Sequence, residues 1–264
     1  MAETSLFHDI QISSHEIEIR KISLKDLKLA LIAGYNDFVS KPSSFVVLLF
    51  IYYPLFAVLY TQYLLNDGLL YMVFPMVVGF TLIGPIVCTA IFEMSRRIET
   101  DLDTGWRAAF NFIHTSAFAP ILALSILMML LYTTWLYMAE FIYFGLFTID
   151  PPGSFDEFAN QLLTTKRGGA LIMSGVGIGS LFAALTLAIS VIAFPLLLDK
   201  PTSMLTAIKT SVRGVGANFL VMLVWGAIVV VTLAIGAALF LVGLAAVLPI
   251  LGHATWHLYR KIIV

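Results

Sequence analysis

The chain has 264 residues, of which 60% are hydrophobic and 12% charged, and its formal net charge is -1. Soluble domains are about 45–50% apolar and about 25% charged, so this chain lacks the polar surface that a soluble domain needs. The near-neutral charge argues against nucleic-acid binding, which needs a basic face. The single cysteine, Cys88, cannot form an internal disulfide. We therefore expect an all-α, polytopic membrane helical bundle.

The first 22 residues are expected to form a polar cytoplasmic tail in front of a single transmembrane domain over 23–264. The tail contains no continuous apolar stretch, so we expect no cleaved signal peptide. Ile17 and Ile19 alternate with charged residues. This two-residue alternation predicts an extended segment.

A surface helix is predicted directly after the tail, over 24–40. Ser23 and Asp26 have the spacing of a helix N-terminal cap. Leucines near one face, with lysines elsewhere, are typical of an amphipathic helix that lies along a membrane surface. Two further segments, near 103–120 and 203–221, have the same character.

Six apolar stretches are predicted to cross the membrane, because a crossing helix needs about 20 apolar residues. We place these spans at 44–65, 69–92, 117–146, 170–198, 217–235 and 238–258. The turn between the last two is the least marked, since no charged residue separates them. One helix over 215–258 would be about 66 Å long, too long for a single crossing. We place the turn at Gly236.

The orientation follows from the basic residues. Of the 15 Lys and Arg residues, all but Lys166 and Arg167 fall in the tail, the C-terminus or alternate loops on one side. Basic residues favour the cytoplasmic side of a membrane. We therefore predict that both termini are cytoplasmic and that the loop over 147–169 lies outside.

The second and sixth spans end in similar sequences. GPIVCTAIFEMSRRI aligns with LPILGHATWHLYRKI, which places Glu93 opposite His257 and Arg96 opposite Arg260. Together with the three surface segments, this similarity suggests an internal repeat of a surface helix plus a helical hairpin. The alternative is that a proline followed by apolar residues and a basic end recurs in unrelated membrane helices.

Candidate functional residues gather at these helix ends. We hypothesise a cytoplasmic polar cluster of Glu93, Arg96, His253, His257 and Arg260 that holds the bundle together or receives a partner or a lipid headgroup. The alternative is five independent side chains in the headgroup region. The two histidines are weak candidates for a metal or haem, since they share a helix face. Two ligands are too few for a zinc site, so we predict no metal site.

Three other residues within the apolar stretches are candidates for a functional or a packing role. Glu140 is a possible intramembrane acid, and such carboxylates are costly and often functional; alternatively, it lies among the headgroups. Gly175 and Gly179 form a Gly-x-x-x-Gly pair that would allow close helix packing. The surrounding GVGIGS is not a dinucleotide loop, because no strand precedes it.

Two stretches carry a family resemblance: IRKISLKDLKLALIAGYNDFVSKPSS from Ile19 and GHATWHLYRKI from Gly252. They resemble the N- and C-terminal signatures of a bacterial family of predicted integral membrane proteins, domain of unknown function 2189. The resemblance would cover 17–263 and implies a bacterial inner (cytoplasmic) membrane, but no activity. Some members carry names likening them to the catalytic subunit of cytochrome c oxidase. That subunit needs six or more histidines on several spans, and only His253 and His257 are candidates here.

The sequence contains no complete catalytic, metal or nucleotide motif, so three functions are weighed. The first is a non-enzymatic scaffold, assembly factor or accessory subunit, whose partners would be membrane lipids and another membrane protein or a respiratory complex. The second is a transporter or channel for a small solute. The third is a haem- or metal-binding redox protein that uses His253 and His257.

Overall fold

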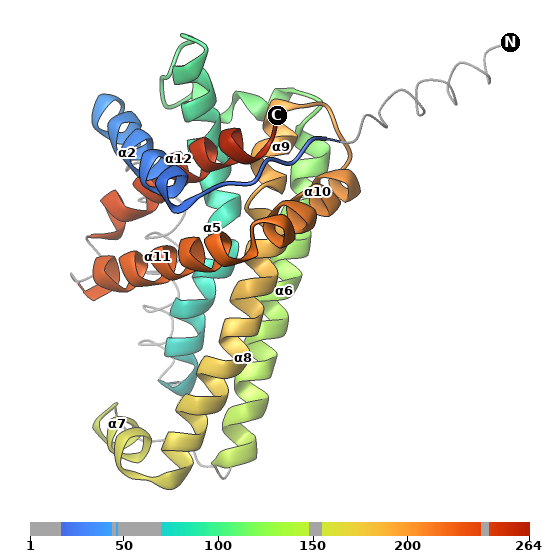
Figure 1. Ribbon diagram of the computed structural model, residues 1–264. Coiled ribbons are helices and arrows are strands. Elements are labelled where there is room, and N and C mark those ends of the chain that lie inside the picture. Colours follow the sequence, from blue (N-terminus) through green and yellow to red (C-terminus); the bar gives the residue numbers. More distant parts are fainter. Residues whose placement is uncertain (1–16, 44–45, 47–69, 148–154, 239–242) are drawn as a thin grey trace, which may run out of the picture.

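The computed structural model describes residues 17–43, 46, 70–147, 155–238 and 243–264 (Figure 1). The predicted first span, 44–65, lies outside these residues apart from Val46. The regular structure of the described residues is helical, which confirms the all-α prediction. The helices are α2 (Leu24–Ser40), α5 (Leu70–Glu99), the 3-10 helix η2 (Ala108–His114), α6 (Phe118–Leu146), α7 (Phe155–Thr164), α8 (Lys166–Ser190), α9 (Ala193–Asp199), α10 (Met204–Ala217), α11 (Phe219–Ala238) and α12 (Leu244–Ile262).

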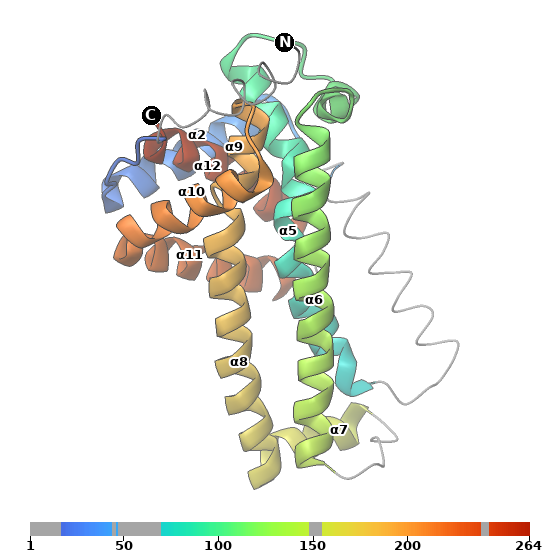
Figure 2. The same ribbon diagram turned by 90° about the vertical axis from the view of Figure 1, so that its right-hand side faces the viewer.

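Three described helical stretches are long and apolar enough to cross a membrane: Phe118–Leu146, Lys166–Asp199 and Phe219–Ala238. The six predicted spans and the repeat are not confirmed. Helices α5, α6 and α8 contact one another and run side by side, as Figures 1 and 2 show from two directions. Helix α11 instead runs across them. The bundle therefore has a long axis, defined by α5, α6 and α8, and a second layer that crosses it.

The turn between α11 and α12 lies beyond the predicted position. Helix α11 continues through Gly236 to Ala238, and α12 begins at Leu244. A Cβ atom on Gly236 would be 3.3 Å from the carbonyl carbon of Gly243. The two backbones are therefore close together at this point, which explains why glycine is found at both positions, although the turn itself falls after Gly236.

Helix α2 begins and ends where it was predicted. The carboxylate of Asp26 accepts hydrogen bonds from the backbone and the hydroxyl of Ser23, which caps the first turn. The buried residues Leu27, Ala30, Gly34 and Asp37 recur at intervals of three or four and form one face. This face packs along α12. A Cβ atom on Gly34 would be 2.7 Å from the Cα atom of Ala254, so the two helices touch backbone to backbone.

The two ends of the described chain are joined. Ile19 forms an isolated antiparallel bridge with Ile263. The backbone N–H of Arg20 donates to the carbonyl of Ile262 over 2.8 Å. The extended segment predicted before α2 is therefore present, and it pairs with the residues that follow α12. An apolar core lies beneath this junction: Leu27, Ile192, Phe194, Leu196, Trp256, Leu258 and Ile262.

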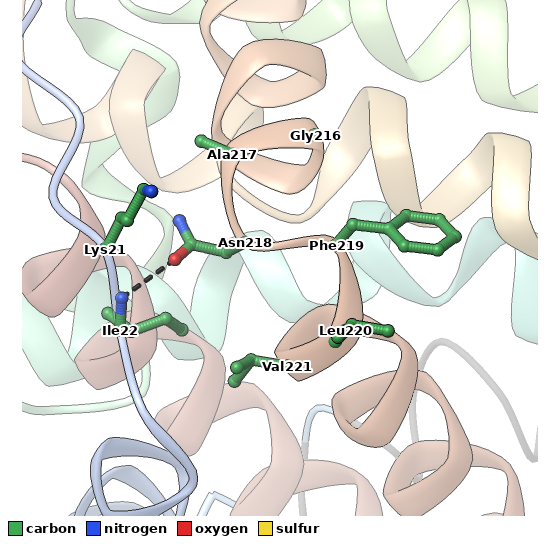
Figure 3. A pocket seen from close by; sticks show the side chains of 8 residues that line it. All are labelled: Lys21, Ile22, Gly216, Ala217, Asn218, Phe219, Leu220 and Val221. Atoms are coloured by element: carbon green, nitrogen blue, oxygen red, sulfur yellow. Dashed lines mark hydrogen bonds between the residues drawn. The ribbon is translucent and has the colours of Figure 1, made fainter.

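The other two predicted surface segments differ in length from the prediction. The segment near 103–120 contains the 3-10 helix η2, and the segment near 203–221 contains α10. Asn218 ends α10 and donates to the carbonyls of Gly214 and Arg20, while its own oxygen accepts from the N–H of Ile22. Figure 3 shows this junction beside a hollow of about 300 Å³ between the N-terminal segment and the start of α11.

The two glycines of the Gly-x-x-x-Gly pair have different surroundings. A Cβ atom on Gly179 would be 3.2 Å from Cη2 of Trp135, on α6, whereas a Cβ atom on Gly175 would meet nothing within 4 Å. Trp135 also donates its indole N–H to the carbonyl of Pro75 over 2.9 Å. Gly179 thus lies at the contact of α5, α6 and α8, and Gly175 takes no part in it.

We therefore expect Gly179→Leu to lower the thermal unfolding midpoint of the detergent-solubilised protein, because the side chain would overpack the contact at a cost of about 1–3 kcal/mol. Gly175→Leu is the matched control, because it has open space, and should leave the midpoint nearly unchanged. Equal midpoints for the two variants would contradict the observed packing of α8 on α6.

Candidate functional site

A network of polar side chains lies where α2, α5 and α12 meet. Asp37 comes from the last turn of α2 and Ser43 from the segment that follows. Ser95 comes from α5, and His253 and His257 come from successive turns of α12. Residues far apart in the sequence are therefore joined in one place, beside the close contact of Gly34 with α12.

The distances within this network are those of good hydrogen bonds. Ser43 Oγ is 2.9 Å from Nε2 of His253, and Ser95 Oγ is 2.7 Å from Nδ1 of the same ring. The Ser95 hydroxyl donates to Oδ2 of Asp37 over 2.7 Å. Nε2 of His257 is 2.8 Å from that same carboxylate oxygen.

The donor and acceptor roles follow from the number of hydrogens available. The hydroxyl of Ser95 has one hydrogen, which it donates to Asp37, so it must accept from Nδ1 of His253. Nε2 of the neutral ring is then an acceptor, and the hydroxyl of Ser43 donates to it. The carboxylate of Asp37 only accepts, so Nε2 of His257 carries a hydrogen. A single arrangement satisfies every bond.

Burial increases along the network. The side chains of His257 and Asp37 are 24% and 11% exposed, whereas those of His253 and Ser43 have no exposure. Burial of Asp37 raises its pKa, but hydrogen bonds from His257 and Ser95 outweigh this effect and hold the pKa below its ordinary value. The carboxylate is therefore ionised at neutral pH.

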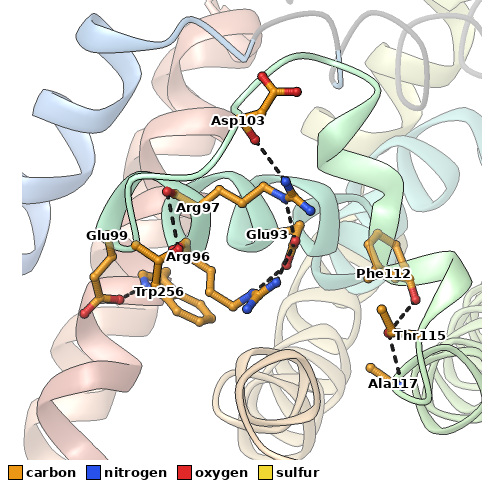
Figure 4. A network of polar contacts seen from close by, with 10 residues as sticks. Glu93, Arg96, Arg97, Glu99, Asp103, Phe112, Thr115, Ala117 and Trp256 are labelled. Carbon is orange, nitrogen blue, oxygen red and sulfur yellow. Dashed lines mark hydrogen bonds and ion pairs between the residues drawn. The ribbon is translucent and has the colours of Figure 1, made fainter.

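Two of the predicted cluster residues pair with each other on α5. Nε and Nη2 of Arg96 donate to the two carboxylate oxygens of Glu93 over 2.7 and 2.9 Å. Arg97 donates to Glu93 as well, over 2.7 Å, and reaches the carbonyl of Asp103 (Figure 4). The Glu93 side chain is 1% exposed, so both guanidinium groups compensate its buried charge.

Arg260 belongs to a third group of contacts. It forms ion pairs with Glu99 at 3.0 Å and with Asp199 at 3.3 Å. Trp256 and Tyr259 donate to the same two carboxylates. In the structure the five predicted cluster residues thus divide among three neighbouring groups. Glu93 pairs with Arg96, Arg260 pairs with Glu99 and Asp199, and His253 and His257 belong to the Asp37 network.

Glu140 is half-buried and lies near the C-terminal end of α6. This end of α6 lies at the opposite end of the bundle from α2 and α12 (Figure 1). Among the described residues, no group of three or more His, Cys, Asp or Glu side chains could hold a metal ion. Both ring nitrogens of His253 are engaged by serine hydroxyls. A metal bound there would first have to displace a serine.

Sequence reasoning missed three members of the network: Asp37, Ser43 and Ser95. A signal existed for Asp37, because it continues the spacing of Leu27 and Gly34 on the buried face of α2. A carboxylate on that face must find partners. Ser95 gives no comparable signal, since a buried serine on a helix is common.

Comparison with family models supports the resemblance seen at the two ends of the sequence. Residues 73–199 match the model of a family described as "Predicted integral membrane protein (DUF2189)". The suspected family is therefore confirmed by the middle of the chain, which carried neither signature. No curated protein and no solved structure matches the chain.

Proposed function

Starting from this match to a family of predicted integral membrane proteins, we propose that the chain is a non-enzymatic scaffold, assembly factor or accessory subunit of a membrane complex. We further propose that it resides in a bacterial inner membrane, with six spans and both termini in the cytoplasm. Its partners are membrane lipids and a second membrane protein, such as a subunit of a respiratory complex.

The observation that carries this proposal is the exposure of α11. This 20-residue helix is the most apolar of the three candidate spans, and 17% of its apolar window is buried, against 50% for the stretch Lys166–Asp199. Val231 and Ile235 are 55% and 56% exposed. An apolar helix with so few contacts inside its own chain needs lipid or another membrane protein against it.

The polar groups support a structural role as well. In the described part of the chain, Glu93, Arg260 and the Asp37 network are each paired with neighbouring side chains. Paired groups join helices to one another and leave few polar atoms free to receive a substrate. A transporter remains the first alternative, and the prolines inside α5, Pro75 and Pro85, favour it, because broken helices often line solute sites.

Purification from native membranes tests the proposal. We expect the intact chain to copurify with a stoichiometric membrane protein. Val231→Trp should reduce the amount of this partner that is recovered, because a larger side chain would disturb packing on α11. Phe141→Trp is the matched control on the exposed face of α6, where Phe141 is 75% exposed. A chain that purifies alone, or a partner lost equally from both variants, would contradict the proposal.

The proposed topology makes a separate prediction for the junction of α11 and α12. With six spans this junction lies on the outer side of the membrane. A cysteine at Ala238, introduced together with Cys88→Ala, should therefore react with an impermeant maleimide in intact cells. A cysteine at Ser154 should react as well, and one at Thr4 should not. Protection at Ala238 with labelling at Ser154 would mean that α11 and α12 do not cross as a pair.

The second alternative is a haem or metal centre at His253 and His257. The engagement of His253 by two serines favours a chain without this cofactor. An optical spectrum of the protein purified from its native membrane distinguishes the two cases, because bound haem gives a strong Soret band. Such a band, lost in His253→Ala, would replace the scaffold proposal with a redox role.

A further inference from the structure

Helix α2 has an outer face, turned away from α12, that combines apolar and basic side chains. We propose that this face binds the anionic headgroups of membrane lipids, with its apolar side chains inserted between them. The binding rests on the membrane location given under the proposed function, and it assigns a class of lipid and a set of binding residues to that location.

The face of α2 that its leucine pattern would turn towards a membrane is already occupied. Leu27, Ala30 and Gly34 are buried, and this side of the helix packs along α12. At Gly34 the two backbones touch, so no lipid can enter between the helices. Any contact of α2 with lipid must therefore use a different face.

A second stripe runs along the outer face of α2. Leu24, Lys28, Ile32, Tyr35 and Val39 follow one another at steps of three or four residues, so they lie on one side of the helix. The four apolar members are between 47% and 60% exposed. A row of large apolar side chains that its own chain leaves open is typical of an interaction surface.

The charges of α2 indicate which kind of surface fits this stripe. Lys25 and Lys28 are exposed, and among the described residues neither forms an ion pair or a side-chain hydrogen bond. The two carboxylates of the helix are engaged elsewhere: Asp26 pairs with Lys261 at 3.7 Å, and Asp37 belongs to the buried network. The outer face is therefore apolar and positively charged, which is complementary to an anionic membrane surface.

This combination favours lipid over a protein partner. Lysine is depleted at protein–protein interfaces, because its flexible, strongly hydrated ammonium group is costly to bury. At a membrane surface, lysine instead lays its methylene groups along apolar neighbours while the ammonium group reaches the lipid phosphates. Helices with apolar and basic residues of this kind bind anionic membranes through both effects.

The place of α2 in the bundle is compatible with this role. The helix lies at the end of the bundle that contains α9 and the C-terminus, and it runs obliquely to the long axis of α6 and α8 (Figures 1 and 2). An oblique helix at one end can lie near the headgroups while α6 and α8 cross the membrane. In the proposed topology this is the cytoplasmic end, and the cytoplasmic surface of a membrane carries anionic lipids.

The test measures which lipid lies beside α2 in the purified, full-length protein. A nitrobenzoxadiazole fluorophore is attached to Ile32→Cys in a Cys88→Ala background, in vesicles of equal parts phosphatidylcholine and phosphatidylglycerol. In two otherwise identical samples, a nitroxide near the headgroup end of the acyl chain is carried by one lipid or by the other. We expect the nitroxide on phosphatidylglycerol to quench the fluorophore at least about twofold more strongly than the nitroxide on phosphatidylcholine.

Charge variants test whether the lysines of α2 cause this preference. Lys25→Gln combined with Lys28→Gln should bring the ratio of the two quenching constants to about one, while quenching itself persists because the apolar stripe remains. Lys166→Gln combined with Arg167→Gln is the matched control, since it removes two exposed basic residues from the start of α8. This control should keep the preference.

Four results would overturn the proposal. Equal quenching by the two lipids in the unaltered lysine background means that α2 does not select anionic headgroups. Absence of quenching means that the stripe faces water. Quenching that grows as the protein is diluted with lipid means that a second copy covers the stripe. A preference that the control also loses means that net charge, and not α2, attracts the lipid.

These results are distinguishable from a failure of the scaffold proposal. The protein is purified without a partner, and both leaflets of the vesicles contain the same lipids. Neither the loss of a copurifying subunit nor a reversed orientation can therefore change the ratio measured at residue 32.

Discussion

Gly34→Ala should lower the thermal unfolding midpoint of the detergent-solubilised protein by about 6–12 °C, which corresponds to about 3 kcal/mol for a chain of this size. The added methyl group would lie 2.7 Å from the Cα and 2.8 Å from the Cβ of Ala254. Backbone atoms cannot rotate away, so α2 would have to move off α12. This cost lies at the upper end of the range for overpacked positions.

Gly216→Ala is the matched control for this change. Gly216 lies on α10, where a Cβ atom would meet nothing within 4 Å. Alanine also forms helices more readily than glycine, by about 1 kcal/mol. The control should therefore leave the midpoint unchanged or raise it. A Gly34→Ala protein as stable as the wild type would show that α2 and α12 do not touch as observed.

His253→Ala should be the second severely destabilising change, at a cost of about 2–5 kcal/mol. The imidazole has no exposed surface, and both of its ring nitrogens are bonded. Its removal leaves a cavity and takes away the partner of the Ser43 hydroxyl, while the Ser95 hydroxyl keeps only its bond to Asp37. Circular dichroism during heating, in one detergent for all variants, measures the effect.

The control for His253→Ala is His114→Ala, which removes the same side chain from an exposed position on η2. This change should shift the midpoint by less than about 0.5 kcal/mol in free-energy terms, as is usual for exposed sites. His257→Ala should fall between the two, because His257 is partly exposed and makes one bond to Asp37. A different order of the three variants would contradict the observed burial.

Local signals predicted the helices well. The cap formed by Ser23 and Asp26 and the spacing of apolar residues placed α2 over Leu24–Ser40, where the structure has it. The long apolar stretches similarly gave α6 over Phe118–Leu146. Capping and periodicity depend on residues a few positions apart, which is why sequence reasoning can identify them.

The relative placement of helices depends on contacts between distant residues, and here the sequence was a weaker guide. The apolar composition of α11 is compatible with a span beside α6 or with a helix that crosses it, because a hydrophobic residue does not specify its partner. We predicted the turn at Gly236, but α11 continues past this residue to Ala238. Gly236 instead allows the close approach of its backbone to that of Gly243.

The candidate site shows the same division. The spacing of His253 and His257 correctly put both rings on one face of α12, and both lie in one network. Their partner on α2, Asp37, could be inferred only from its place on a buried face. The alignment of Glu93 with His257 led us to place both in one cluster, but Glu93 has its own arginines within one turn. Local ion pairs form more readily than long-range ones.

The central claim is that Asp37 of α2 and His257 of α12 interact directly within the buried network, and a double-mutant cycle tests it most directly. We expect Asp37→Asn and His257→Ala, measured singly and together by thermal unfolding, to show a coupling energy of about 1 kcal/mol or more, as residues in contact do. The cycle of Glu93→Gln with His257→Ala serves as the reference and should be nearly additive. Strict additivity of Asp37→Asn and His257→Ala would contradict the network.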